Sequence, residues 1–177
     1  MSGPRIVATV SESLFAEFFS EQDAGRLARA AEALGGGFVR VDSLDEVADL
    51  GDTTVVITSW SSERFDEPLL DRLPNLELVA HTGATVKFLV SDALFERGAL
   101  VTQAGAGMGR SVAEVSLTFT LNLLHRVPEM HEAVRAGRWY DADAVGSQHE
   151  ILGCPIAVIG ASRTGRSYLE LIGALGA

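Results

Sequence analysis

The sequence is poor in the residues that build disulfides, metal sites and nucleic-acid interfaces. It holds one cysteine, Cys154, which cannot form an internal disulfide, and no Cys/His cluster has metal-ligand spacing. Acidic residues outnumber basic ones by 24 to 14, and the formal net charge of -10 opposes binding to phosphate backbones. These scarcities predict no metal, no nucleic-acid partner and a reducing, cytoplasmic setting in which Cys154 is a small packing residue.

Long apolar runs are missing as well. None reaches the roughly 18 to 20 residues that a membrane helix needs, and Glu12 and Glu17 interrupt the place where a signal peptide would be apolar. Hydrophobic residues nevertheless make up 47% of the 177, and charged residues 21%, as in globular proteins. The sequence therefore predicts a soluble, folded protein that neither spans a membrane nor is exported.

Short apolar segments rich in β-branched residues recur along the first hundred residues. They predict strands at 5–10, 38–41, 53–58, 76–80 and 99–102. Between the first two, Phe15, Phe18 and Phe19 have helical spacing, and a capping box from Ser20 to Asp23 predicts a second helix. Strands that alternate with helices indicate a parallel sheet covered on both faces, a doubly wound α/β domain.

Residues 112–124 carry two conflicting signals. Apolar residues alternate with polar ones from Val115 to Leu123, and a period of two indicates a strand. The run has no turn, however, and is long for a strand but ordinary for a helix. We therefore predict a helix.

A glycine-rich turn follows one more strand pattern. Residues 155–159 have the composition of a buried strand, and residues 160–165, Gly-Ala-Ser-Arg-Thr-Gly, have the spacing of a dinucleotide-binding turn before a helix. Gly160 would make the tight turn and Gly165 would let the helix pack closely, so that unpaired N–H groups face a pyrophosphate. The predicted cofactor contacts are Gly160, Ser162, Arg163, Thr164 and Gly165.

Ser162 departs from the usual motif, because a second glycine normally lets the backbone approach the phosphates at that position. A phosphate site and a plain strand-to-helix turn that merely needs glycines both remain open from the motif alone.

Several landmarks recur in a specific order over the last hundred residues. They are 74–87, Arg97-Gly98, Val112-Ala113-Glu114, 135–139 and Glu150–Gly153 before 156–160. Together they resemble the D-2-hydroxyacid dehydrogenase family, which includes phosphoglycerate, glyoxylate and formate dehydrogenase-like members. Residues 1–73 match only in the order of strands and helices. The wording Gly-Ala-Ser-Arg also occurs in short-chain dehydrogenases, but there it follows the first strand, so that family ranks second.

The resemblance implies an α/β architecture in which a flavodoxin-like substrate domain is interrupted by a Rossmann-type cofactor domain. It assigns the flavodoxin-like domain to 1–110, a long linking helix and crossover to 111–150, and the first strand-turn-helix of the Rossmann-type domain to 151–177. The chain would then be the N-terminal portion of a longer protein, truncated within its NAD-binding domain, although a natural truncated product stays open. Family members interconvert 2-keto and D-2-hydroxy acids with NAD or NADP. They commonly form homodimers through the helix that here starts near Val112.

The resemblance also assigns a substrate-binding loop. Gly83, Ala84 and Thr85 would offer backbone N–H groups to the substrate carboxylate, which requires a tight loop that an anion can approach. Thr85 replaces a usual second glycine and Lys87 replaces a usual aspartate. Lys87 is either an attractive charge for an acidic substrate or a solvated surface lysine.

No catalytic residue is assigned within the chain. Hydride transfer to a keto acid needs a cation that holds the substrate and a general acid that protonates it. In the family an arginine is the cation and a histidine backed by a glutamate is the acid, and the matching positions lie beyond Ala177. The four histidines, at 81, 125, 131 and 149, stand at none of these positions and are predicted to be surface or packing residues.

Two functions are consistent with these observations. The first is an oxidoreductase of the 2-hydroxyacid dehydrogenase type, of which this chain alone is inactive; NADH-dependent reduction of glyoxylate or hydroxypyruvate by the chain would contradict that prediction. The second is a non-catalytic remnant that serves as a binding or dimerisation module, which the departures at Ser162, Thr85 and Lys87 favour.

Overall fold

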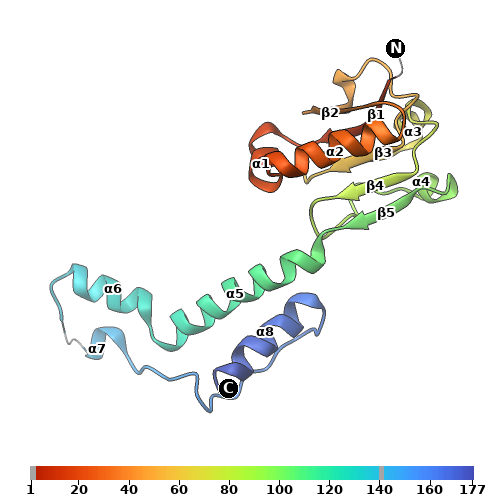
Figure 1. The fold of residues 1–177 in the computed structure, drawn as a ribbon. Coiled ribbons are helices and arrows are strands. Elements are labelled where there is room, and N and C mark those ends of the chain that lie inside the picture. Colours follow the sequence, from red (N-terminus) through yellow and green to blue (C-terminus); the bar gives the residue numbers. More distant parts are fainter. Residues whose placement is uncertain (1–2, 140–141) are drawn as a thin grey trace. The chain divides into compact units, whose positions relative to one another are not determined.

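The computed structural model describes residues 3–139 and 142–177, and Figure 1 shows the chain as a ribbon. The chain divides into two compact units, Met1–Ala104 and Gly105–Ala177, which we call unit 1 and unit 2.

Unit 1 is built on a five-stranded sheet. Its strands are β1 (Pro4–Thr9), β2 (Gly37–Val41), β3 (Val55–Thr58), β4 (Leu78–His81) and β5 (Leu100–Gln103). The strand order is β2-β1-β3-β4-β5, and all neighbouring pairs are parallel. This is the flavodoxin-like, doubly wound order, so the predicted fold class of this part is confirmed.

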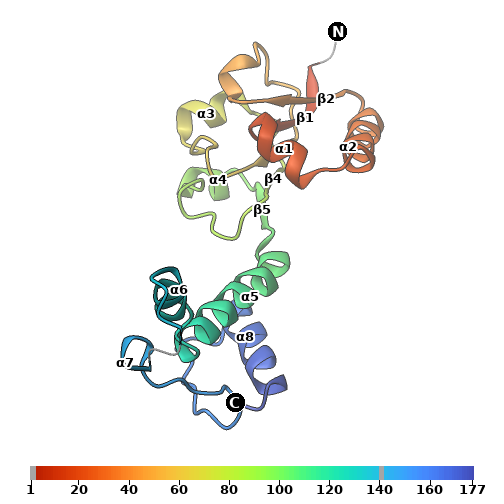
Figure 2. The same ribbon diagram turned by 90° about the vertical axis from the view of Figure 1, so that its left-hand side faces the viewer.

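Helices cover both faces of the sheet, as Figure 2 shows for α2 on one side and for α3 and α4 on the other. The connecting helices are α1 (Glu12–Phe18), α2 (Glu21–Ala33), α3 (Glu67–Arg72), α4 (Asp92–Glu96) and the short 3-10 helix η1 (Leu44–Glu46). The sheet has a hydrophobic core on each face, and successive residues of β1 point into different cores. Ile6 belongs to the core that includes Leu27 of α2, and Val7 belongs to the core that includes Leu70 of α3. The predicted capping box that begins α2 at Ser20 is present.

Unit 2 is helical in its described residues, with α5 (Gly105–Leu124), α6 (Val127–Arg135), α7 (Ala142–Val145) and α8 (Arg163–Ala174). A small core joins α5 to α8 through Ala113, Tyr168 and Ile172. The helix predicted at 112–124 is confirmed and begins earlier, at Gly105. None of the helices in the described ranges combines the length and apolarity needed to cross a membrane.

The alternating pattern of α5 arises from two apolar stripes on different sides of the helix. Leu117 and Leu121 pack on the core with α8, whereas Val115, Phe119 and Leu123 are exposed. Between them, polar side chains donate hydrogen bonds to the backbone carbonyl oxygen four residues earlier. The donors are the hydroxyl groups of Ser116, Thr118 and Thr120 and the amide group of Asn122. Those bonds let polar side chains alternate with apolar ones inside a helix.

The prediction of a strand at 155–159 is wrong. The segment has no strand assignment; Ile156 and Val158 are partly buried against the core, whereas Ile159 is fully exposed. A strand exists through pairing with another extended segment, and no other segment of unit 2 forms a strand in the described residues.

Candidate functional site

The first candidate site lies where β3 and β4 end, at the edge of the sheet to which all parallel strands point their carboxyl ends. The backbone N–H and the hydroxyl of Thr82 both donate to the Thr58 carbonyl oxygen, each at 2.9 Å. The N–H of Ala104 donates to the Gly83 carbonyl oxygen at 2.8 Å. These bonds fix the beginning of the loop that follows β4. In doubly wound sheets, ligands bind at this carboxyl edge.

The loop then presents free backbone donors. Ala84 and Thr85 are exposed and lie outside helices and strands. Within the described part of the chain, neither of their N–H groups donates to a protein acceptor. Backbone N–H groups without a protein acceptor donate hydrogen bonds to water or to a ligand. The loop can therefore bind an anion.

Gly83 is packed too closely for any side chain. A Cβ atom placed on it would lie 2.5 Å from His81 Nε2, 2.9 Å from Trp60 Cε2 and 3.0 Å from Trp60 Nε1. Carbon atoms in favourable contact lie about 3.5–4.0 Å apart. Glycine at this position is thus required by the close approach of the loop to two rings.

His81 is the buried polar group beneath the loop. Its side chain bonds through Nδ1 to the Thr58 hydroxyl at 3.1 Å, and the residue is 2% exposed. Its Nε2 is buried and has no partner among the described residues. Burial lowers the pKa of the imidazole below its usual value of about 6.5, which favours the neutral form near pH 7.

An aromatic row runs along the same edge, made of Phe18, Trp60, His81 and Phe88. Each ring meets the next edge-on: Phe18 to Trp60 at 5.9 Å, Trp60 to His81 at 6.1 Å and His81 to Phe88 at 5.6 Å between centroids. Phe18, Trp60 and Phe88 are 40, 44 and 37% exposed, while His81 is buried. The row joins the end of α1 to the ends of β3 and β4 and presents an apolar surface beside the free N–H groups.

The second candidate site is the glycine-rich turn of unit 2. Gly160 has a φ of +95°, which favours glycine, and a Cβ atom on Gly165 would overlap the Gly160 carbonyl oxygen. The Arg166 side chain holds the turn through an Nε bond to the Ala161 carbonyl oxygen at 2.8 Å. Both glycines are therefore demanded by the turn geometry itself.

Ser162 is the N-cap residue of α8, and its hydroxyl makes no capping hydrogen bond. The first helical N–H to find an acceptor is that of Arg166, which donates to the Ser162 carbonyl oxygen at 2.9 Å. The N–H groups of Arg163, Thr164 and Gly165 precede it in the first turn and have no intrahelical acceptor. The structure brings together all five residues predicted to contact a cofactor, in one turn of unit 2.

Metal-ligating side chains do not cluster in the described ranges. No group of three or more His, Cys, Asp or Glu side chains in the described ranges could hold a metal ion. His149 contributes its backbone N–H to the Leu124 carbonyl oxygen at 2.9 Å. Cys154 is half-buried and free.

Sequence reasoning missed the Thr58–His81 pair and the three half-exposed aromatic residues of the row. A signal was present, since Trp60 stands two residues after Thr58, the end of an apolar β-branched run, where a parallel sheet places its binding edge. The contacts themselves join residues far apart in the chain, which no local pattern reveals.

Comparison with known proteins gives the family context. No protein-family model matches the chain. Glyoxylate/hydroxypyruvate reductase B of Escherichia fergusonii is 30% identical over 115 residues, which cover 62% of this chain and 34% of that protein.

Two solved structures share the fold. D-lactate dehydrogenase from Aquifex aeolicus, solved with NAD and lactic acid, superposes with a TM-score of 0.70 at 19% identity and covers 97% of this chain and 48% of that one. A glyoxylate reductase from Paecilomyes thermophila gives a TM-score of 0.72 at 16% identity, covering 99% and 54%. The chain spans between a fifth and about a third of the curated relatives that it matches. The predicted relationship is confirmed at the level of the family.

Proposed function

From the relationship of this chain to D-2-hydroxyacid dehydrogenases, we propose that it supplies the substrate-binding part of an NAD(P)-dependent oxidoreductase of 2-keto and 2-hydroxy acids. Unit 1 binds the substrate carboxylate through the N–H groups of the loop Gly83, Ala84 and Thr85. The observation that carries the proposal is that the backbone N–H groups of two exposed residues, Ala84 and Thr85, have no acceptor within the described residues.

The loop suits a carboxylate for electrostatic reasons. Hydrogen bonds to an ionised acceptor are roughly twice as strong as neutral ones, so two adjacent N–H donors form an effective anion site. Lys87 lies exposed in the same loop and is in no ion pair within the described ranges. It adds a positive charge that favours an acidic ligand.

A titration followed by amide chemical shifts tests the loop directly. Glyoxylate should shift the Ala84 and Thr85 backbone amide resonances of the 177-residue chain, and glycolaldehyde, which lacks the carboxylate, should leave them in place. Equal shifts with both compounds, or none at these two amides with glyoxylate, would refute the carboxylate site.

The turn at 160–165 is proposed to contact the pyrophosphate of NAD or NADP. Its support is the set of free first-turn N–H groups and the positive end of the α8 dipole. NAD should shift the amides of Arg163, Thr164 and Gly165 more than those of the last turn of α8. A shift pattern spread evenly along α8 would argue for a plain strand-to-helix turn.

A second function, a dimerisation module, is favoured by the outer apolar stripe of α5. Val112, Val115, Phe119 and Leu123 are 44, 52, 63 and 74% exposed and share one face of the helix. We place a homodimer contact there. Sedimentation should show a dimer that Phe119→Glu converts to a monomer, while Thr118→Glu, an exposed change off the stripe, leaves it intact. A monomeric parent chain would exclude this contact.

A further inference from the structure

The aromatic row beside the loop bears on which acids the site accepts. Its outer rings belong to Phe18, Trp60 and Phe88, and each keeps more than a third of its surface exposed although all three are large and apolar. Phe18 packs edge-on against Trp60, and Trp60 and Phe88 both pack edge-on against the buried His81.

Among the exposed rings of the row, Trp60 lies against Gly83, the first residue of the proposed carboxylate loop. Its indole would be 2.9 Å from a Cβ atom on Gly83, the residue directly before the free N–H of Ala84. The Trp60 indole therefore packs against the residue that directly precedes the proposed carboxylate donors. The rings are also held in place, because His81 is fixed to Thr58 and packs against both Trp60 and Phe88.

We propose that Trp60, flanked by Phe18 and Phe88, binds the side chain of the 2-keto acid, so that the site prefers acids with a branched apolar or aromatic side chain over glyoxylate. This inference rests on the proposed carboxylate site and names its substrate class. Glyoxylate carries only hydrogen at that position and cannot cover the aromatic surface. A four-carbon branched side chain removes apolar area from water on both partners.

The size of the preference follows from apolar burial. Full burial of one methylene changes affinity about fourfold. A side chain of four carbons that is half covered by the exposed row should therefore gain at least about tenfold over glyoxylate, equivalent to about 1.4 kcal/mol.

A phosphorylated acid is the competing ligand, because Lys87 lies in the same loop. It is the only cation among residues 83–88 and is exposed. One solvated lysine offers a phosphate dianion a single weak contact, whereas the aromatic row offers a fixed surface. The test therefore includes 3-phosphoglycerate.

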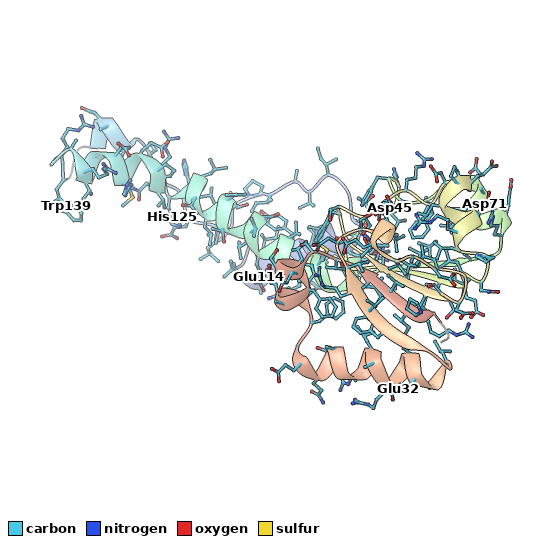
Figure 3. The ribbon with its side chains drawn as sticks, turned by 90° about the horizontal axis from the view of Figure 1, so that it is seen from above. Glu32, Asp45, Asp71, Glu114, His125 and Trp139 are labelled. Carbon is cyan, nitrogen blue, oxygen red and sulfur yellow. The ribbon has the colours of Figure 1, made fainter. Side chains whose placement is uncertain are left out.

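The experiment is a chemical-shift titration of the ¹⁵N-labelled chain with 4-methyl-2-oxopentanoate, glyoxylate and 3-phosphoglycerate. The chain has two tryptophans, so two indole N–H resonances are expected. Figure 3 shows the second, Trp139, just beyond α6, and it is 67% exposed in unit 2. We expect 4-methyl-2-oxopentanoate to bind at least about tenfold tighter than glyoxylate and to shift the Trp60 indole, with Trp139 serving as the internal control.

Two variants assign the preference to Trp60. Trp60→Ala should reduce the tenfold preference to less than about threefold, and Trp60→Phe should retain most of it because a flat ring remains. Trp139→Phe should change nothing. Should Trp60→Ala fail to fold, Trp60→Phe and the ligand series still decide.

The outcomes separate the two levels of the argument. Shifts at Ala84 and Thr85 with equal affinity for glyoxylate and 4-methyl-2-oxopentanoate would overturn the aromatic preference and leave the carboxylate site standing. Tighter binding of 3-phosphoglycerate, or a preference that survives Trp60→Ala, would overturn it as well. No shift at Ala84 and Thr85 with any acid would refute the carboxylate site, and the preference with it.

Discussion

Replacement of Gly83 by alanine should destabilise unit 1, because the added methyl group has nowhere to go. Its position lies 2.5 Å from His81 Nε2 and 2.9 Å from Trp60 Cε2, about 1 Å inside ordinary contact. His81 is 2% exposed and bonded to Thr58, so it cannot move aside without losing that bond. Overpacking of a filled site costs typically about 1–3 kcal/mol.

Gly37→Ala is the matched control within the same unit. Gly37 begins β2, and a Cβ atom placed there meets nothing within 4 Å. Its replacement should alter stability by less than about 0.5 kcal/mol, as is usual for surface changes. Urea denaturation in a Trp139→Phe background isolates Trp60, whose fluorescence then reports on unit 1 alone.

The expected result is a lower urea midpoint for Gly83→Ala at an unchanged slope, and a melting temperature lower by roughly 4–8 °C for each kcal/mol. A His81→Ala background should remove at least half of that cost, because the nearest obstructing atom is gone. Equal stabilities of Gly83→Ala and Gly37→Ala would show that the loop does not approach His81 as described.

Three further predictions concern single contacts. Gly165→Ala should destabilise unit 2 by more than about 2 kcal/mol, because the new methyl group would overlap a backbone carbonyl. Gly173→Ala has open space around it and should stabilise α8 by about 0.5–1 kcal/mol. Hydrogen exchange along α8 measures both changes. Tyr168→Phe removes the 2.6 Å bond to Thr120 and should cost about 1 kcal/mol by thermal unfolding. Because burial lowers the pKa of His81, the unfolded chain binds its proton first, so the stability of unit 1 should fall as pH drops below about 6.5 and level off below the folded-state pKa; a His81→Asn chain that shows the same fall would contradict this.

Local patterns were sufficient for most of unit 1. The β-branched runs located all five strands, since strands buried on both faces of a parallel sheet are nearly continuous apolar segments. The capping box at Ser20 predicted the start of α2, because that signal depends on residues three positions apart. Both are properties that a short window of sequence contains.

Tertiary context decided the rest. Residues 155–159 have the composition of a strand but form none, because pairing depends on a neighbouring segment and not on composition. The aromatic row unites Phe18, Trp60 and Phe88 from three separate connections, and only the strand order brings them to one edge. Gly83 shows the same limit. The family resemblance suggested a glycine for an anion-binding loop, whereas the close approach to His81 and Trp60 is visible only in the fold.

The acidity of the chain sharpens the argument for a locally built anion site. A net charge of -10 repels a carboxylate ligand, but at physiological salt charges further than about 8 Å away are largely screened. What would act on a ligand at the proposed site are the nearby groups of the loop, the two unpaired N–H donors and the exposed Lys87. A protonated His81 would add a positive charge, yet it would have to be buried without a counterion, and burial opposes this. Because the overall field is largely screened, the proposed site would depend for its selectivity on its immediate surroundings, and we propose that Trp60 and its aromatic neighbours provide it.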